Sequence, residues 1–121
     1  MSSPSEVVQR FANALLGGDF AAVEASFAET ARFTEALSDT PMFPVADNGT
    51  VAQGAKAIRA FYETAFAQMT FQLEIADRVE WGSVVVDHEI ATGPPFATPF
   101  HSVWMYVVHD GVIHSMHGSH A

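Results

Sequence analysis

The sequence predicts an α+β domain in which helices cover one face of an antiparallel sheet. Apolar residues repeat at helical spacing in three segments of the N-terminal half, whereas from Thr70 onward the period changes to two. Four strands then follow one another, separated by short turns such as Gly82-Ser83 and Asp110-Gly111, and strands joined in this way pair antiparallel. One face of such a sheet packs on the helices, and a cavity can open between them.

Length and composition indicate one domain, residues 1–121, with apolar surface to spare. Hydrophobic residues make up 49% of the chain and charged residues only 16%, which favours a ligand cavity, a subunit interface or both. The formal net charge of −9 makes nucleic acid and anionic membrane poor partners, because both require a basic surface.

The chain has no cysteine, and its polar, acidic N-terminus does not resemble a signal peptide. It also has no 18-residue apolar run that would span a membrane. We therefore expect a cytoplasmic protein that needs no cofactor.

The three expected helices have recognisable start or stop signals. They run from Ser3-Pro4-Ser5 to Gly17-Gly18, from the capping residue Asp19 to about Ala28, and from Gly54 to about Phe66. The third has an unusually aromatic stripe, which includes Phe61 and favours core packing against a sheet.

The segment Thr30 to Leu37 predicts a first strand with an acid on its apolar face. Phe33, Glu35 and Leu37 share one parity, so Glu35 lies between two apolar residues. Glu35 is either solvated at the strand end or enclosed in an apolar wall, where desolvation would raise its pKa and make it a candidate base. Residues 38–53 then predict a long loop, or a loop with a poor strand, that folds over something apolar.

The strand 84–92 has two different faces. Val84, Val86, His88 and Ile90 form the more apolar set, which we expect to face the helices and to bring His88 inside as an acid–base group or a core histidine. If the register is shifted by one residue, Asp87 and Glu89 point inward instead.

The last strand, 112–120, contains His114, His117 and His120. On a strand His117 points away from the other two, so three ligands do not converge, and we expect no metal site.

Several motifs resemble the ketosteroid isomerases over residues 5–66. They are Val7-Val8-Gln9-Arg10-Phe11, Ala14-Leu15, Gly18-Asp19, Phe27-Ala28 and Ala31, then Gly54, Ala57-Ile58-Arg59 and Phe61-Tyr62. The order of helices and strands resembles the wider nuclear transport factor 2-like superfamily, which includes SnoaL-like polyketide cyclases, limonene epoxide hydrolases and scytalone dehydratase. The resemblance implies three helices packed on a curved antiparallel sheet that forms a cone with an apolar pocket.

The resemblance also implies roles for individual residues. Glu35 stands where the isomerases place their base, whereas Phe11 stands where they have a donor tyrosine and Trp104 near their second donor. It directs Trp104 and Tyr106 of the strand 98–109 toward the pocket, with Tyr106 as a replacement donor, and it favours His117 inside. Limonene epoxide hydrolases use an Arg-x-Asp pair, but Val85 replaces the arginine before Asp87, so that mechanism is not transferred.

Two functions follow as hypotheses. The first is an enzyme for isomerisation, cyclisation or dehydration of an apolar, carbonyl-bearing molecule, with Glu35, His88, Tyr106 and His117 as catalytic residues. Its substrate would lie against Phe11, Phe33, Phe61, Ser102 and Trp104. The second is a non-catalytic module that binds a small ligand or dimerises. In both cases we expect a homodimer.

Overall fold

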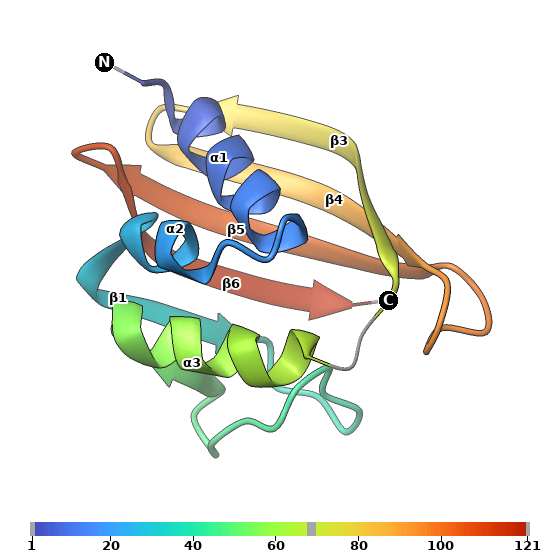
Figure 1. Ribbon diagram of the computed structural model, residues 1–121. Helices are drawn as coiled ribbons and strands as arrows, with labels where there is room; N and C mark the ends of the chain where they lie inside the picture. Colours follow the sequence, from blue (N-terminus) through green and yellow to red (C-terminus); the bar gives the residue numbers. More distant parts are fainter. Residues whose placement is uncertain (1, 68–69, 121) are drawn as a thin grey trace.

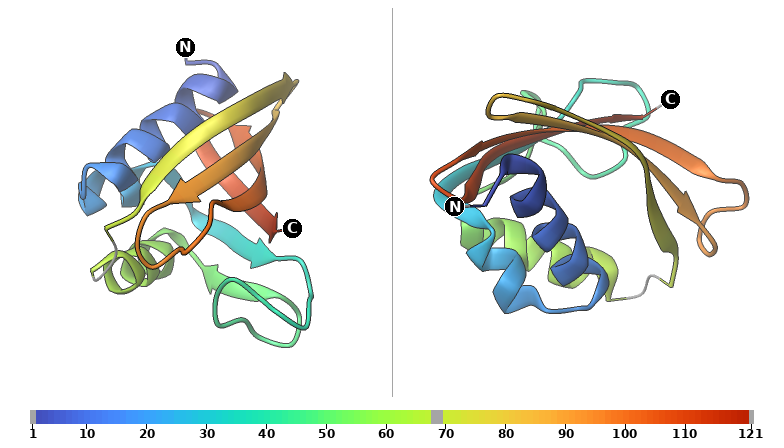
Figure 2. Two further views of the ribbon diagram at one scale, coloured as in Figure 1. Left: turned by 90° about the vertical axis from the view of Figure 1, so that its right-hand side faces the viewer. Right: turned by 90° about the horizontal axis from the view of Figure 1, so that it is seen from above.

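The computed structural model describes residues 2–67 and 70–120. In this part of the chain, three helices lie on one face of a six-stranded sheet (Figure 1). The sheet is curved but not closed, and the helices occupy its concave side (Figure 2). The predicted α+β fold is confirmed, with the cavity-forming face of the sheet turned toward the helices.

The helices begin where the capping residues require. Helix α1 (Pro4–Leu16) starts with a capping box, in which the Ser3 hydroxyl accepts from the Glu6 amide and the Glu6 carboxylate accepts from the Ser3 amide. Helix α2 (Phe20–Ala25) is capped by the Asp19 carboxylate, which accepts from the Ala22 amide. Helix α3 comprises Ala55–Phe66 and follows Gly54, whose φ of 92° suits glycine.

The strands are ordered β2-β1-β6-β5-β4-β3 across the sheet. Their bounds are Phe27–Glu35 for β1, Thr50–Gln53 for β2, Gln72–Trp81 for β3, Val84–Thr92 for β4, Phe100–His109 for β5 and Val112–His120 for β6. Every pair is antiparallel except β1 with β6, which is parallel. Strands β1 and β6 are thus distant in the sequence, and their pairing joins β2-β1 to the other four strands of the sheet.

Several boundaries differ from the sequence-based expectation; β1 ends at Glu35 and not Leu37, and β5 begins at Phe100 and not residue 98. The second helix ends at Ala25 rather than about Ala28, and β1 accordingly begins at Phe27, because the Ser26 amide closes the helix and the chain then pairs with β6 at Ile113. The segment 38–53 contains the short strand β2 after its loop, which was one of the two alternatives that the sequence left open.

The side of β4 that faces the helices is the reverse of the expected one. Val85, Asp87, Glu89 and Ala91 are buried, whereas Val84, Val86, His88 and Ile90 point outward and are partly exposed. The apolar outward residues do not require burial under the helices here, because the outer face of the neighbouring strand β5 is also apolar, with Val103 and Met105 nearly half exposed.

The face of β5 that points toward the helices is the expected one, whereas the face of β6 that points toward them is not. Ser102, Trp104, Tyr106 and Val108 of β5 are buried on the concave side. In β6 the buried residues are Ile113, Met116 and Gly118, so His117 lies on the outer face. The reason is a register irregularity between Val107 and Val108, which changes the parity of β6 after Ile113.

Candidate functional site

A pocket of about 390 Å³ lies between the concave face of the sheet and the helices. Helices α1 and α3, strands β3 to β6 and the loop residues Thr40 to Phe43 all contribute to its wall. The pocket is thus formed by elements from the whole domain, as the sequence analysis expected for a cavity between helices and sheet. Its size is in the range of small-molecule sites.

The pocket wall is rich in aromatic side chains. Nine of its described residues are phenylalanine, tyrosine or tryptophan: Phe11, Phe43, Tyr62, Phe66, Phe71, Phe96, Phe100, Trp104 and Tyr106. The polar members are few, namely Thr40, Glu89, Ser102 and His120, and none of the described lining residues is a lysine or an arginine. The wall therefore favours an apolar ligand without a strong negative charge.

Glu89 is the acidic side chain among the described residues of this wall. It extends from β4, is only 8% exposed, and accepts a hydrogen bond from the Tyr106 hydroxyl at 3.3 Å. Burial raises the pKa of Glu89 from its ordinary value of 4.5 to about 7, and the nearby Asp87 charge adds to the increase. A carboxyl with this pKa exchanges its proton readily near neutral pH, as a general acid or base requires.

An ion pair lies beside Glu89, two residues along β4. The fully buried Asp87 carboxylate accepts from Arg78 of β3 through both oxygens, at 2.7 Å from Nε and 2.9 Å from Nη2. Arg78 also donates to the Gln9 side chain at 3.1 Å, which ties the pair to α1. The positive charge of Arg78 opposes the rise in the pKa of Glu89. The protonation of Glu89 is thus set by burial and by this pair together.

Two buried tyrosines of the pocket wall are influenced by the Glu89 charge. Tyr106 is on β5 and Tyr62 on α3, and each is almost completely buried. Burial and the nearby Glu89 raise the pKa of both phenols well above 10, so both hydroxyl groups keep their protons at neutral pH. The Tyr62 hydroxyl contacts the Met116 sulfur at 3.7 Å, which is a weak hydrogen bond. Both phenols can therefore act as hydrogen-bond donors.

Trp104 does not present a free donor to the pocket. Its indole N–H donates to the Ser102 hydroxyl at 3.0 Å. The Ser102 hydroxyl then retains its own proton for donation, because a hydroxyl both donates and accepts. Of these two lining residues, Ser102 is the one with a hydrogen bond to offer a ligand.

Glu35, the base expected from the sequence, is buried but is not part of the pocket lining. Its two carboxylate oxygens accept from consecutive backbone amides of the following loop, Met42 at 2.5 Å and Phe43 at 3.1 Å. Leu37, which shares its parity, lies beyond the end of β1 and is 69% exposed.

The two histidines expected inside the pocket lie on the outer face of the sheet. The ring of His88 stacks on His101 and the two are hydrogen-bonded at 2.8 Å between Nε2 and Nδ1. The His117 Nδ1 bonds to the Thr34 hydroxyl at 2.7 Å. The inward orientation predicted for His88 and His117 is therefore wrong, because β4 and β6 present the opposite parity to the helices.

The expected substrate-binding residues divide into two groups. Phe11, Ser102 and Trp104 line the pocket. Phe33 and Phe61 lie behind the wall and support it, since both pack edge-to-face against the lining residue Phe43, with ring centroids 5.9 and 5.0 Å away.

The sequence predicted Glu89 only as a second choice and gave Tyr62 no role at the site. The sequence predicted an inward Glu89 only for the alternative register of the strand 84–92. The signal that could have identified it is the pairing of two acids on one parity, Asp87 and Glu89, with Arg78 on the adjacent strand to balance one charge.

Within residues 2–67 and 70–120, no three side chains of suitable type lie close enough to hold a metal ion. In the same ranges, no helix has the length and apolarity required to cross a bilayer.

Three helices on the concave side of an unclosed, curved sheet, with an apolar pocket between them, define a nuclear transport factor 2-like fold. Residues 8–116 match the model of the SnoaL-like domain. The chain therefore belongs to the SnoaL-like domain family.

Solved structures with the same fold include proteins with different described activities. A candidate ketosteroid isomerase from Kribbella flavida has a TM-score of 0.71 at 14% identity, over 95% of this chain and 75% of that one. A candidate polyketide cyclase from Sinorhizobium meliloti has a TM-score of 0.73 at 17% identity, over 93% of this chain and 92% of that one. An LEH-like epoxide hydrolase from M. tuberculosis has a TM-score of 0.70 at 17% identity, over 95% of this chain and 80% of that one. At these identities the likeness concerns the fold alone. No protein of curated function matches the chain.

Proposed function

We propose that this protein is a small enzyme that moves protons on an apolar, carbonyl-bearing molecule, with Glu89 as its general base. The observation that carries the proposal is the buried Glu89 carboxyl, the acid among the described residues of a largely apolar pocket wall, which is bonded to a phenol and whose pKa burial raises to about 7. Isomerisation, cyclisation and dehydration all begin with the same step, removal of a proton next to a carbonyl group. The described activities of the isomerase and cyclase relatives support this class of reaction.

In the proposed step, the ionised Glu89 takes a proton from the carbon next to the carbonyl, and negative charge develops on the carbonyl oxygen. The electron pair of the broken C–H bond forms the C=C bond of the enolate. Ser102 supplies a hydrogen bond to that oxygen, and the Tyr106 hydroxyl, which donates to the ionised Glu89, turns to it as Glu89 takes up the proton. These two hydroxyl groups replace the donors that the isomerases use at the positions of Phe11 and Trp104. In isomerisation the neutral Glu89 then returns the proton to another carbon. In dehydration it gives the proton to a hydroxyl group that leaves as water, and in cyclisation the enolate carbon attacks a second carbonyl of the same molecule, whose oxygen takes the proton.

The test is deuterium uptake from D₂O into neutral bicyclic and tetracyclic ketones that the pocket can accommodate. The wild-type protein is expected to accelerate uptake, and Glu89→Gln to lower the rate by about a hundred-fold or more. Glu35→Gln is the matched comparison, since Glu35 is the base that the sequence predicts. Loss of activity in Glu35→Gln with full activity in Glu89→Gln would reverse the assignment in favour of Glu35.

The alternative is a binding module that does no chemistry. It is supported by the engagement of the Trp104 N–H with Ser102, which leaves few donors for an oxyanion. Ketones that shift the NMR signals of pocket residues but gain no deuterium would favour this function.

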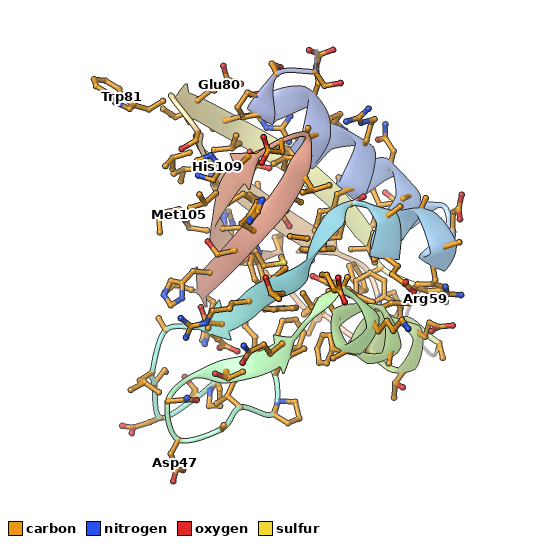
Figure 3. The ribbon with its side chains drawn as sticks, turned by 90° about the vertical axis from the view of Figure 1, so that its left-hand side faces the viewer. Asp47, Arg59, Glu80, Trp81, Met105 and His109 are labelled. Carbon is orange, nitrogen blue, oxygen red and sulfur yellow. The ribbon has the colours of Figure 1, made fainter. Side chains whose placement is uncertain are left out.

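The outer face of the sheet supports a homodimer. Val103 and Met105 are 47% and 43% exposed there, and Met105 points away from the helices (Figure 3). Apolar side chains of this size on a charge-poor face are typical of subunit contacts. The cytoplasmic location stays a prediction.

A further inference from the structure

Glu35 holds a segment of the pocket wall. Thr40, Pro41, Met42 and Phe43 line the pocket from a loop without regular structure. Backbone amides in such a loop have no partner from a helix or a sheet, and a buried amide without a partner is costly. Glu35 supplies the partners for two of them, since one carboxylate oxygen accepts from Met42 and the other from Phe43.

The need is mutual. Glu35 is 3% exposed, and none of the ion pairs among the described residues includes it. A buried carboxylate without hydrogen-bond partners is costly, and bonds from backbone amides to a carboxylate are among the stronger ones. The carboxylate and the two amides thus satisfy one another, and each fixes the position of the other.

Other contacts give the loop one defined path. The chain returns to β1 at Gly49, whose carbonyl accepts from the Glu35 amide at 2.8 Å. A Cβ at Gly49 would lie 2.6 Å from the Glu35 carbonyl oxygen, so only glycine permits this approach. At the other end of the segment, the His120 ring donates to the Thr40 carbonyl. The loop is therefore anchored at both ends of the stretch that lines the pocket, by Thr40 and by Met42 and Phe43, and again where it returns at Gly49.

The anchored residues are the ones that shape the cavity. The ring of Phe43 packs on Phe33 and Phe61, and on the lining residue Trp104, with ring centroids 5.0 to 6.3 Å apart. Displacement of the Phe43 backbone would remove this ring from the wall and open the pocket toward solvent.

We propose that Glu35 is a positioning residue that fixes the wall formed by residues 40–43 and so determines how long the pocket retains an apolar ligand. This role requires only that the pocket binds such a ligand, and it stands whether or not Glu89 acts as a base. It also differs from the role of base that the position of Glu35 implies by resemblance.

The test combines backbone amide exchange by NMR with dissociation of the neutral dye N-phenyl-1-naphthylamine. In Glu35→Gln one carboxylate oxygen becomes an NH₂ group, which cannot accept from an amide. The Met42 and Phe43 amides are expected to exchange about ten-fold faster or more, and the dye to leave several-fold faster. Amides of the central strand β5 are expected to keep the wild-type rate.

Three matched variants separate the steps of the argument. Glu29→Gln, on the exposed side of the same strand, should change neither measurement. Phe43→Leu should speed dye release while the amides of residues 42 and 43 stay protected, because it alters the wall and not the tether. Glu89→Gln should leave those amides protected, which distinguishes this inference from the proposed catalytic role.

Unchanged exchange at Met42 and Phe43 in Glu35→Gln would overturn the proposal, as would a uniform rise over all core amides. Faster local exchange with unchanged dye release would also overturn it, since the wall would then not depend on the tether. If Glu35→Gln does not fold, Glu35→Asp provides the same measurements, because its shorter carboxylate cannot reach both amides.

Discussion

Replacing Glu89 by glutamine should remove a pH dependence of stability that the wild-type protein has. The folded protein keeps the proton on Glu89 up to about pH 7, whereas an ordinary carboxyl releases it near 4.5. Between these values the folded state binds more protons than the unfolded state, so the free energy of unfolding falls as the pH rises. One pKa unit corresponds to about 1.4 kcal/mol, which gives a loss of about 3 kcal/mol across this window.

The glutamine side chain has the same shape as that of glutamate but does not titrate. Relative to wild type, Glu89→Gln should therefore gain about 3 kcal/mol in the free energy of unfolding as the pH is raised from 4.5 to 8. Urea denaturation at closely spaced pH values measures the difference, and other titrating groups cancel because both proteins contain them. Glu74→Gln, an exposed position on β3, serves as the control and should show a flat difference. A flat difference for Glu89→Gln would refute the argument that Glu89 is buried and titrates near neutral pH.

Three further predictions follow from neighbouring contacts. Arg78→Met leaves the Asp87 carboxylate buried without its cation, so urea denaturation at pH 7 should show a loss of about 3 kcal/mol in the free energy of unfolding. The additional change Asp87→Leu should largely restore that stability. A loss below about 1 kcal/mol in Arg78→Met contradicts this prediction. Gly118→Ala places a Cβ 2.3 Å from the Trp104 ring and should lower the free energy of unfolding by about 1 to 3 kcal/mol. The loss should be smaller in a Trp104→Leu background, which lacks the ring. Equal losses in both backgrounds would contradict the predicted clash. Val103→Glu with Met105→Glu should convert the expected dimer to a folded monomer in sedimentation velocity, and an unchanged oligomeric state would locate the interface elsewhere.

The sequence was sufficient for the fold because each local signal agrees with the tertiary structure. The Asp110-Gly111 pair predicts the β5–β6 hairpin, and both residues adopt the positive φ, 54° and 75°, that a two-residue turn of this kind requires. The parallel pairing of β1 with β6 has no such local signal, since it joins residues that are distant in the sequence.

The candidate site was predictable only in part. Tyr106, Trp104, Ser102 and Phe11 were expected at the pocket and line it. The strand β4 was misread because hydrophobicity decides orientation only where one face of a sheet is apolar. Here Val84, Val86 and Ile90 point outward, while the inward Asp87 is neutralised by Arg78. That compensation depends on a contact between strands, which the pattern of one strand does not contain.

The position of β6 in the strand order has a consequence for how the chain acquires its structure. Without residues 112–120 the sheet consists of two separate pieces, β2-β1 and β5-β4-β3, because β6 alone pairs with both. During synthesis the first strand must therefore wait for the last, and we expect cooperative folding only after β6 has left the ribosome. Pairings of such long sequence separation are slow to form, so the early helices and β1 remain exposed to aggregation until residues 112–120 have been synthesised.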